Sequence, residues 1–183
     1  MRGPTTAQTF LERIAEIVRV RAGMSVAEMG AGRGRLTRLI TEAAGASGHI
    51  FAIEPDEDDA AHIQIETGYR NNIHVVESPP HATPIASDSC DRVIMANIWT
   101  ELQDPVAALD EARRLLRDDG RLMVIEWHMD ADSPPAPPPQ FRIGFDAMVQ
   151  VLERRSWDIL RHGNVGPYNY FIEAAISDES VQS

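Results

Sequence analysis

Short apolar runs alternate along the chain with longer segments in which apolar residues recur at helical spacing. The runs are too short for helices and are typical of buried strands; they cover residues 26–29, 49–53, 73–76, 92–96 and 122–125. Helical segments precede or separate these runs, except that a polar, proline-bearing connection over 78–89 leads to the fourth, and we count five alternations of strand and helix. This order predicts a parallel sheet with helices on both faces.

The helical segments carry start and stop signals. Residues 5–21 predict an amphipathic helix, and the acids at 56–59 begin another, where negative charge suits the helix dipole. Asp104-Pro105 opens a third, because an N-cap acid and a proline at the first helical position are favoured there. The pattern ends that helix at 118–120, and a last helix is expected over 145–155.

The alternation stops near the C-terminal end. Residues 131–140 hold five prolines, which lack a donor N–H and fix φ, so we expect an extended connector, either a loop over the site or a stiff spacer. Two strands follow, at 157–161 and 168–176. Their short connection through Gly163 and Gly166 predicts an antiparallel hairpin at the sheet edge.

These elements predict an α/β fold class. We expect a doubly wound, mostly parallel, seven-stranded sheet of the Rossmann-like type, with an antiparallel C-terminal edge strand. A chain of 183 residues has the usual size of one domain with one core. The expected organisation is a single domain over 1–176 and a disordered polar tail over 177–183.

Composition and charge disfavour several classes of binding partner. The net charge of −11 disfavours nucleic acid and anionic membrane surfaces, which attract basic faces. The single cysteine, Cys90, allows neither an internal disulfide nor a multi-cysteine metal site, and we predict no metal. No apolar run approaches the roughly 20 residues that span a bilayer. The N-terminus lacks the apolar core of a signal peptide, so we expect a cytoplasmic location.

The strongest functional signal lies at the end of the first apolar run. This run ends in Glu28, and glycines follow at alternate positions, Gly30, Gly32 and Gly34, before a helical pattern. Glycine permits positive φ and lets a ligand lie against the main chain. The N–H groups at the start of the next helix favour electron-rich ligand groups. A dinucleotide fingerprint would require a glycine at position 35, where the chain has Arg35.

An acid followed by G-x-G-x-G resembles motif I of the class I S-adenosylmethionine-dependent methyltransferases, in particular their small, minimal-domain members. Three further segments match this family in order: Ile53-Glu54-Pro55 after the second strand, residues 87–94 before and into the fourth strand, and residues 109–122 before the fifth strand. The resemblance extends over nearly the whole chain. It implies S-adenosyl-L-methionine as the cofactor.

The resemblance also implies a set of cofactor-binding residues: Glu28, Gly30, Ala31, Gly32, Gly34, Glu54, Pro55 and Asn97. Glu54 would accept both ribose hydroxyls. Glu28 would lie near the amino-acid end of the cofactor, and a main-chain carbonyl near Asn97 would face its ammonium group. Plainer alternatives stay open, since strand-end acids are often solvated or cap helices, Gly34 can serve helix packing alone, and Asn97 can cap a loop.

One segment departs from the family pattern. Family members often place an acid a few residues after the third strand, where it contacts the adenine amine. Here the aligned position is Pro79. Either Glu77 or a backbone carbonyl takes over this contact, or adenine is held less specifically.

Methyl transfer requires alignment of the reactants and, for some acceptors, a base. We expect residues after the fourth and fifth strands to line the transfer site: Asn97, Trp99, Glu101, Glu126 and His128. His128 is the candidate general base, because imidazole titrates near neutral pH; a surface histidine is the alternative. Trp99 could stack on the acceptor or cover the sulfonium by cation–π attraction, and packing in the core is the alternative.

The expected function is S-adenosylmethionine-dependent methyl transfer to a small molecule or a protein side chain. DNA bases are disfavoured, because Asn97 is not followed by the double proline of amino-methylating nucleic-acid enzymes. One alternative is a non-catalytic module of the same fold that binds the cofactor or a partner, and another is a dinucleotide oxidoreductase. The acceptor and the oligomeric state stay open.

Overall fold

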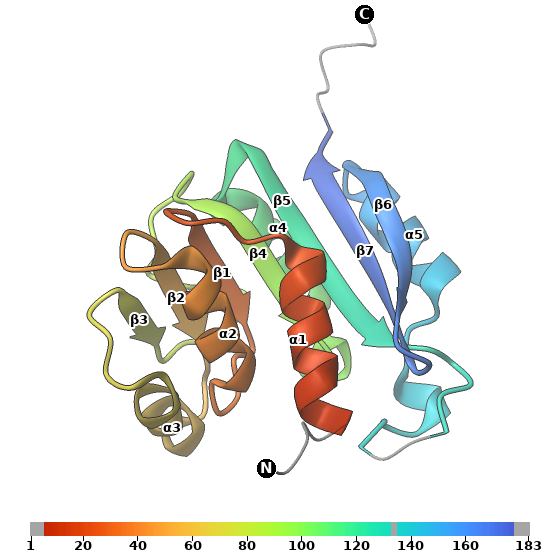
Figure 1. The fold of residues 1–183 in the computed structure, drawn as a ribbon. Helices are drawn as coiled ribbons and strands as arrows, with labels where there is room; N and C mark the ends of the chain where they lie inside the picture. The colour runs from red at the N-terminus through yellow and green to blue at the C-terminus, as the bar shows by residue number, and fades with distance from the viewer. Residues whose placement is uncertain (1–5, 133–134, 178–183) are drawn as a thin grey trace, which may run out of the picture.

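The computed structural model describes residues 6–132 and 135–177, which form one seven-stranded sheet between two layers of helices (Figure 1). The strands are β1 (Ser25–Met29), β2 (His49–Ile53), β3 (Ile73–Val76), β4 (Cys90–Ala96), β5 (Leu116–Trp127), β6 (Trp157–Val165) and β7 (Asn169–Ile176). The helices are α1 (Thr6–Val18), α2 (Arg35–Ala44), α3 (Glu57–Thr67), α4 (Pro105–Leu115) and α5 (Phe145–Arg154), with short 3-10 helices η1 (Trp99–Glu101) and η2 (Pro139–Phe141).

The strand order is β3-β2-β1-β4-β5-β7-β6. The first five strands in this order are parallel, and β7 pairs antiparallel with β5 on one side and β6 on the other. The predicted fold class is therefore confirmed. Because β1, β2, β4 and β5 are parallel, their carboxyl ends lie at one edge of the sheet, where ligands of open α/β folds bind.

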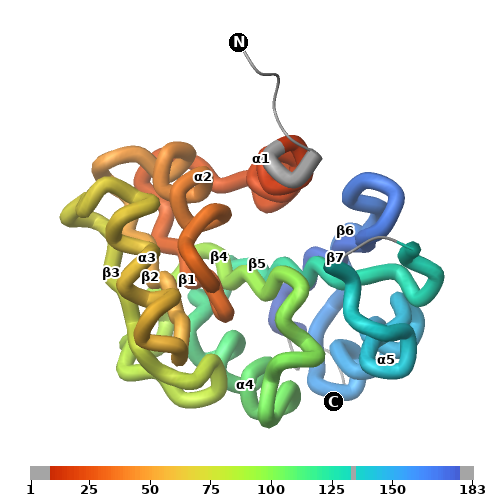
Figure 2. The backbone as a smooth tube through the Cα atoms, turned by 90° about the horizontal axis from the view of Figure 1, so that it is seen from below, coloured from red at the N-terminus to blue at the C-terminus, as the bar shows by residue number. Residues whose placement is uncertain are grey.

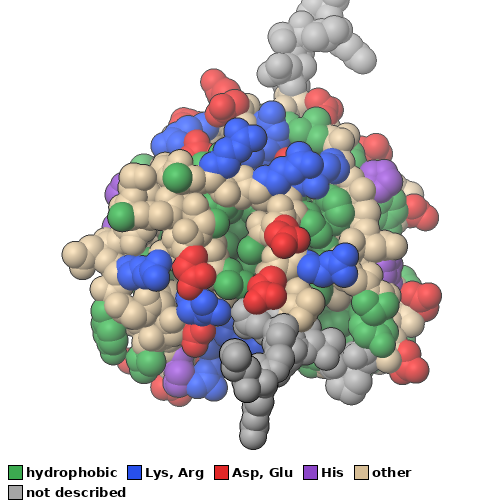
Figure 3. Space-filling model, viewed as in Figure 1, with side chains coloured by type: hydrophobic (Ala, Val, Ile, Leu, Met, Phe, Trp, Pro, Cys, Tyr) green, Lys and Arg blue, Asp and Glu red, His purple; other side chains and the backbone are tan. Residues whose placement is uncertain are grey.

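The two faces of the sheet carry separate hydrophobic clusters, because successive side chains of a strand point to opposite sides. Val26 and Ile94 pack with α1 and α2 on one face, whereas Ala27 and Val93 pack with α4 and α5 on the other. Figure 2 shows α1 and α2 above the sheet and α4 and α5 below it. On the face that carries α1, acidic and basic side chains are interspersed, with hydrophobic ones between them (Figure 3).

The predicted helix starts are present as side-chain caps. The Asp56 carboxylate accepts the N–H of Asp59 at 3.0 Å, and the Asp104 carboxylate accepts the N–H of Ala107 at 2.9 Å, with Pro105 in the first turn. Each cap satisfies one N–H that has no partner within the helix. Among the described helices, none is both long enough and apolar enough to cross a membrane.

Several predicted element ends were wrong. The first helix ends at Val18, because Arg19 has a left-handed φ of 57°. The fourth helix ends at Leu115, and residues 116–121 already belong to β5, since Leu116 pairs with Cys90 of β4. Gly163 lies within β6 rather than in the hairpin turn. The last two of these ends are set by pairing with neighbouring strands of the sheet, which local periodicity does not encode.

The proline-rich connector is anchored by one arginine. The Arg142 guanidinium donates to the carbonyls of Pro137, Met129 and Ala131 at 2.6, 3.0 and 2.8 Å. The carbonyls of this irregular segment have no partner strand. A guanidinium, which has five N–H donors, can bond to several of them at once. Of the tail predicted to be disordered, residues 178–183 lie outside the described residues, as do 133–134 within the connector.

A substitution at Gly34 tests whether its close contact with Ile63 determines how α2 packs on α3. It caps α2 with a φ of +81°, and a Cβ there would lie 2.9 Å from the Cα of Ile63 in α3. We expect Gly34→Ala to lower the free energy of unfolding by roughly 2–4 kcal/mol, combining a left-handed backbone with overpacking. Chemical denaturation measures this.

Gly68→Ala is the matched control. Gly68 has a similar φ of +72°, but no atom lies within 4 Å of where its Cβ would be. It should therefore lose only the cost of the left-handed backbone, about 1 kcal/mol. Equal losses in the two variants would show that contact with Ile63 contributes nothing.

Candidate cofactor and acceptor site

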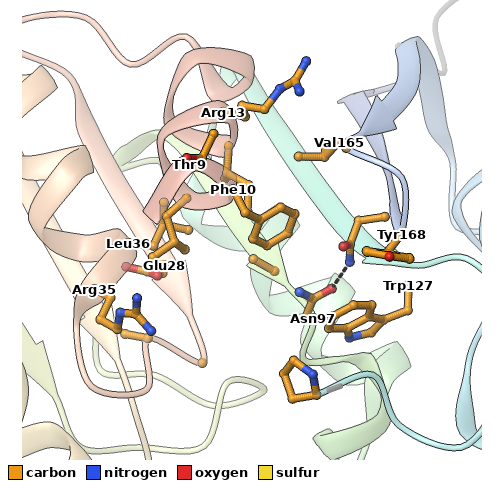
Figure 4. A pocket seen from close by; sticks show the side chains of 18 of the residues that line it. Thr9, Phe10, Arg13, Glu28, Arg35, Leu36, Asn97, Trp127, Val165 and Tyr168 are labelled. Carbon is orange, nitrogen blue, oxygen red and sulfur yellow. Dashed lines mark hydrogen bonds between the residues drawn. The ribbon is translucent and has the colours of Figure 1, made fainter. Parts of the chain in front are cut away.

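Two cavities meet at the carboxyl edge of the sheet. The larger, of about 920 Å³, lies between α1, the glycine turn after β1, the end of β4 and the β6–β7 turn (Figure 4). The smaller, of about 130 Å³, lies between the ends of β2 and β4 and the segment after β3. Gly30 lines both. The predicted glycine turn therefore lies where the two cavities adjoin.

The glycines of this turn have different tasks. Gly30 has a φ of +70°, and a Cβ there would lie 2.6 Å from a methyl carbon of Ile98, so the turn after β1 touches the loop after β4. Gly32 has a φ of +52°, and nothing lies within 4 Å of where its Cβ would be. Gly34 packs on α3, which agrees with the interpretation that this glycine serves helix packing. The open space at Gly32 is the cradle that a close-lying ligand requires.

Glu54 is fixed at this turn by two backbone donors. Its carboxylate accepts the Gly32 N–H at 2.7 Å through one oxygen and the Asp56 N–H at 3.1 Å through the other. The residue is 8% exposed and lines the smaller cavity next to Pro55. Each carboxylate oxygen keeps a lone pair after these bonds, so the group is oriented and still able to accept a diol.

Glu28 lies in the wall of the larger cavity and is almost completely buried. The Thr37 hydroxyl of α2 donates to its carboxylate at 2.6 Å. Desolvation by burial raises the pKa of Glu28 to about 8, a rise that the Thr37 bond opposes and the nearby Glu54 charge supports. A positively charged ligand group beside Glu28 would favour its ionised form.

The smaller cavity has a proline-rich wall. Pro79, Pro80 and His81 line it, together with Ile98 and Glu101 from the loop after β4. Glu77, the acid considered as a replacement for the missing family acid, is exposed and outside this lining. The polar side chains that do line the cavity near this wall, His81 and Glu101, were not considered for adenine from the sequence.

Asn97 lies at the end of β4, in the wall of the larger cavity, with a left-handed φ of 58°. Its side-chain oxygen accepts an N–H of Asn169 from β7 at 2.8 Å (Figure 4). Below this loop, the buried Glu126 carboxylate accepts the Trp99 N–H at 2.9 Å. Burial raises the pKa of Glu126 to about 7, against backbone donors that lower it.

The residues expected at the transfer site separate in the structure. Asn97 lines the larger cavity and Glu101 the smaller one, whereas Trp99, Glu126 and His128 line neither. The His128 ring nitrogen lies 3.1 Å from the Asn164 side-chain oxygen, and the ring packs at 5.7 Å from that of Tyr170. A base role for His128 stays a prediction that this placement does not support.

Sequence reasoning missed much of the larger cavity. Its other side chains include Phe10, Arg13, Arg35, Trp127, Tyr168 and Asn169. They come from the first helix, the start of α2, the end of β5 and the final hairpin, which are far apart in sequence. Phe10 falls in the segment predicted as an amphipathic helix and Tyr168 in the last predicted strand, and an apolar spacing does not distinguish a core position from a cavity wall.

A family model described as a methyltransferase domain matches residues 27–124, more than half of the chain. The chain belongs to the class I S-adenosylmethionine-dependent methyltransferase family. The resemblance based on Glu28, the glycine turn and Glu54 is thus confirmed, and so is the cofactor that it implies. Within the described residues of this methyltransferase, no group of three or more histidine, cysteine or acidic side chains is placed to hold a metal ion.

A curated relative, the ubiquinone/menaquinone biosynthesis C-methyltransferase UbiE of Hahella chejuensis, is 33% identical over 114 residues. The match covers 59% of this methyltransferase and 45% of the relative, so the chain spans less than half the length of that protein.

Two solved structures illustrate the shared fold. A SAM-dependent methyltransferase from Aquifex aeolicus has a TM-score of 0.85 and 22% identity, with 94% of each chain covered. The 1,6-didemethyltoxoflavin-N1-methyltransferase of Burkholderia thailandensis, with bound 1,6-didemethyltoxoflavin and S-adenosylhomocysteine, has a TM-score of 0.72 and 18% identity over 92% of this chain and 79% of that one.

The raised pKa of Glu28 predicts a pH-dependent stability. Between its ordinary value of 4.5 and about 8, the native state keeps a proton that the unfolded chain releases. Stability contributed by this group therefore falls as pH rises through that window. We expect Glu28→Gln to be more stable than the parent at pH 8 and to show a shallower decline from pH 5 to pH 8 in chemical denaturation.

Asp58→Asn serves as the control, because Asp58 is an exposed acid in the first turn of α3. It should keep the slope of the parent protein. A Glu28→Gln profile parallel to that of the parent would mean that Glu28 is ionised in the native state.

Proposed function

We propose that this methyltransferase transfers the methyl group of S-adenosyl-L-methionine to a small-molecule acceptor held in the larger cavity. The position of Glu54 carries the proposal. Its carboxylate is held by the Gly32 and Asp56 N–H groups and faces the smaller cavity, beside the open cradle at Gly32. This arrangement suits a ribose diol, and the described lining of the smaller cavity holds no lysine or arginine that would attract a phosphate.

The two cavities suit the two ends of the cofactor. We assign the adenine to the smaller cavity, whose wall of Pro79, Pro80 and Ile98 offers flat apolar contact. The methionine end then passes Gly30 into the larger cavity, where Glu28 would attract its ammonium group and Arg35 its carboxylate. Figure 4 shows Glu28 and Arg35 on the same side of this cavity.

The larger cavity also supplies room for an acceptor. Its volume lies within the usual range of small-molecule sites, and its lining is mainly apolar. Bound S-adenosyl-L-methionine would supply a methyl group already activated by the sulfonium. The protein's part is to align the acceptor with that group and to exclude water, through α1 and Pro135 in the wall of the cavity.

Two finer expectations stay part of this proposal. A cytoplasmic location and the lack of a nucleic-acid partner rest on composition and on the net charge of −11. The name of the UbiE relative raises the option of a carbon acceptor, but the match covers less than half of that protein.

Calorimetric titration with S-adenosyl-L-methionine tests the proposal. We expect saturable binding at one site, and we expect Glu54→Ala to weaken it about 10-fold to 100-fold through loss of a charge-assisted contact. Glu57→Ala, which removes an exposed acid three residues away, should bind like the parent. If the parent protein fails to bind at millimolar ligand, the proposed function is wrong.

A further inference from the structure

The polar lining of the larger cavity consists mainly of hydrogen-bond donors. Arg13, Arg33 and Arg35 contribute guanidinium groups, and Tyr168 contributes a hydroxyl. Arg33 lies 3.9 Å from Asp59, whereas neither Arg13 nor Arg35 forms an ion pair with a described carboxylate. All three arginines are exposed, so they place positive charge at the rim of the cavity, where it would favour the approach of an anion.

The amide pair at the end of β4 and β7 adds an oriented donor. Because the Asn97 oxygen accepts from Asn169, the Asn97 amide nitrogen is left to donate elsewhere. Figure 4 shows this nitrogen turned toward the side of the cavity that holds Phe10. Asn169 is only 3% exposed and Asn97 is half-buried, so this part-buried hydrogen bond orients the Asn97 amide.

Aromatic side chains form the walls around this donor. Phe10 comes from α1, Trp127 from the end of β5 and Tyr168 from the β6–β7 turn. They lie around Asn97 in Figure 4. Aromatic walls favour planar rings, which stack face to edge or with an offset.

Glu28 is the one carboxylate in the described lining of the larger cavity, and it lies away from Asn97. Glu28 accepts the Thr37 hydroxyl at 2.6 Å and lies with Arg35 on the side of the glycine turn. Asn97, Trp127 and Tyr168 lie on the opposite side in Figure 4. The described lining on the acceptor side thus offers the neutral donors of Asn97 and Tyr168 to an anion and holds no carboxylate that could remove a proton.

Building on the proposed function, we propose that the methyl acceptor is a planar aromatic molecule that binds as an oxygen anion, an acidic phenol or enol in its ionised form. Its ring lies between Phe10, Trp127 and Tyr168, and the Asn97 amide donates to its anionic system. The acceptor already carries its negative charge when it binds, so it needs no protein base.

The charges and bonds of this transfer balance. The acceptor anion, through its oxygen or a conjugated carbon, forms a bond to the methyl carbon as the carbon–sulfur bond breaks. The bonding pair stays on sulfur, so a sulfonium cation and an acceptor anion become two neutral groups. With an oxygen acceptor no proton is released; a conjugated carbon acceptor loses its ring proton to water afterwards. An aliphatic amine, by contrast, would first have to lose a proton from its ammonium form.

The test uses the protein saturated with S-adenosylhomocysteine and 4-nitrophenol as the probe, because its phenolate has a separate absorbance band. We expect saturable binding of the phenolate and a lower apparent pKa for the bound phenol than for the free one. Benzylamine and benzyl alcohol, which share the benzene ring but carry no anionic oxygen, should compete at least about tenfold more weakly, since the donors prefer an anion.

Asn169→Asp supplies the variant and Asn164→Asp its matched control. Both add one negative charge on the final hairpin, but Asn169 lines the cavity, whereas Asn164 is exposed and contacts His128 outside it. We expect Asn169→Asp to weaken 4-nitrophenolate binding about tenfold or more and Asn164→Asp to leave it unchanged. Binding of S-adenosylhomocysteine should be similar in both.

The outcomes separate this inference from the proposed function. Failure to bind S-adenosylhomocysteine would overturn the proposed function. Normal binding of S-adenosylhomocysteine with preference for benzylamine, or with no 4-nitrophenolate binding, would overturn the acceptor class alone. An equal loss in the two asparagine variants would exclude the amide pair as the group that recognises the anion.

Discussion

The parallel alignment of β1, β2, β4 and β5 is the constraint from which the site follows. It places the carboxyl ends of these strands at one edge, so that Glu28, Glu54 and Asn97 line two adjoining cavities although they lie far apart in sequence. One hydrogen bond then joins two of these ends, since the Gly32 N–H donates to Glu54. A second link, the contact of Gly30 with Ile98, joins the end of β1 to that of β4.

These links order the turn after β1 and the loop after β4 before any ligand binds. The Glu54 carboxylate is fixed by main-chain donors, and the loop after β4 is fixed by Glu126 beneath it. A preformed arrangement spares the ordering of side chains on binding. The buried acid Glu28 is tolerated without a ligand, because burial raises its pKa to about 8 and the Thr37 hydroxyl donates to its carboxylate.

The sequence predicted the fold and the identity of the cofactor because both leave local signals. Apolar run length, the caps at Asp56 and Asp104, and the glycine spacing after Glu28 each act within a few residues. The acceptor half depends on contacts across the whole chain, such as Asn97 with Asn169, which are 72 positions apart. Phe10 and Tyr168 likewise carry patterns that fit a core equally well. His128 was favoured by its residue type, but pairing of β5 with β7 directs its ring toward Tyr170.

A crystal structure of the complex with S-adenosylhomocysteine tests the central claim most directly. We expect the ribose hydroxyls at Glu54, the adenine between Pro79 and Ile98, and the amino-acid end beside Glu28 and Arg35, with free space left at Asn97. A ligand whose ribose does not contact Glu54, or whose adenine lies in the larger cavity, would contradict it.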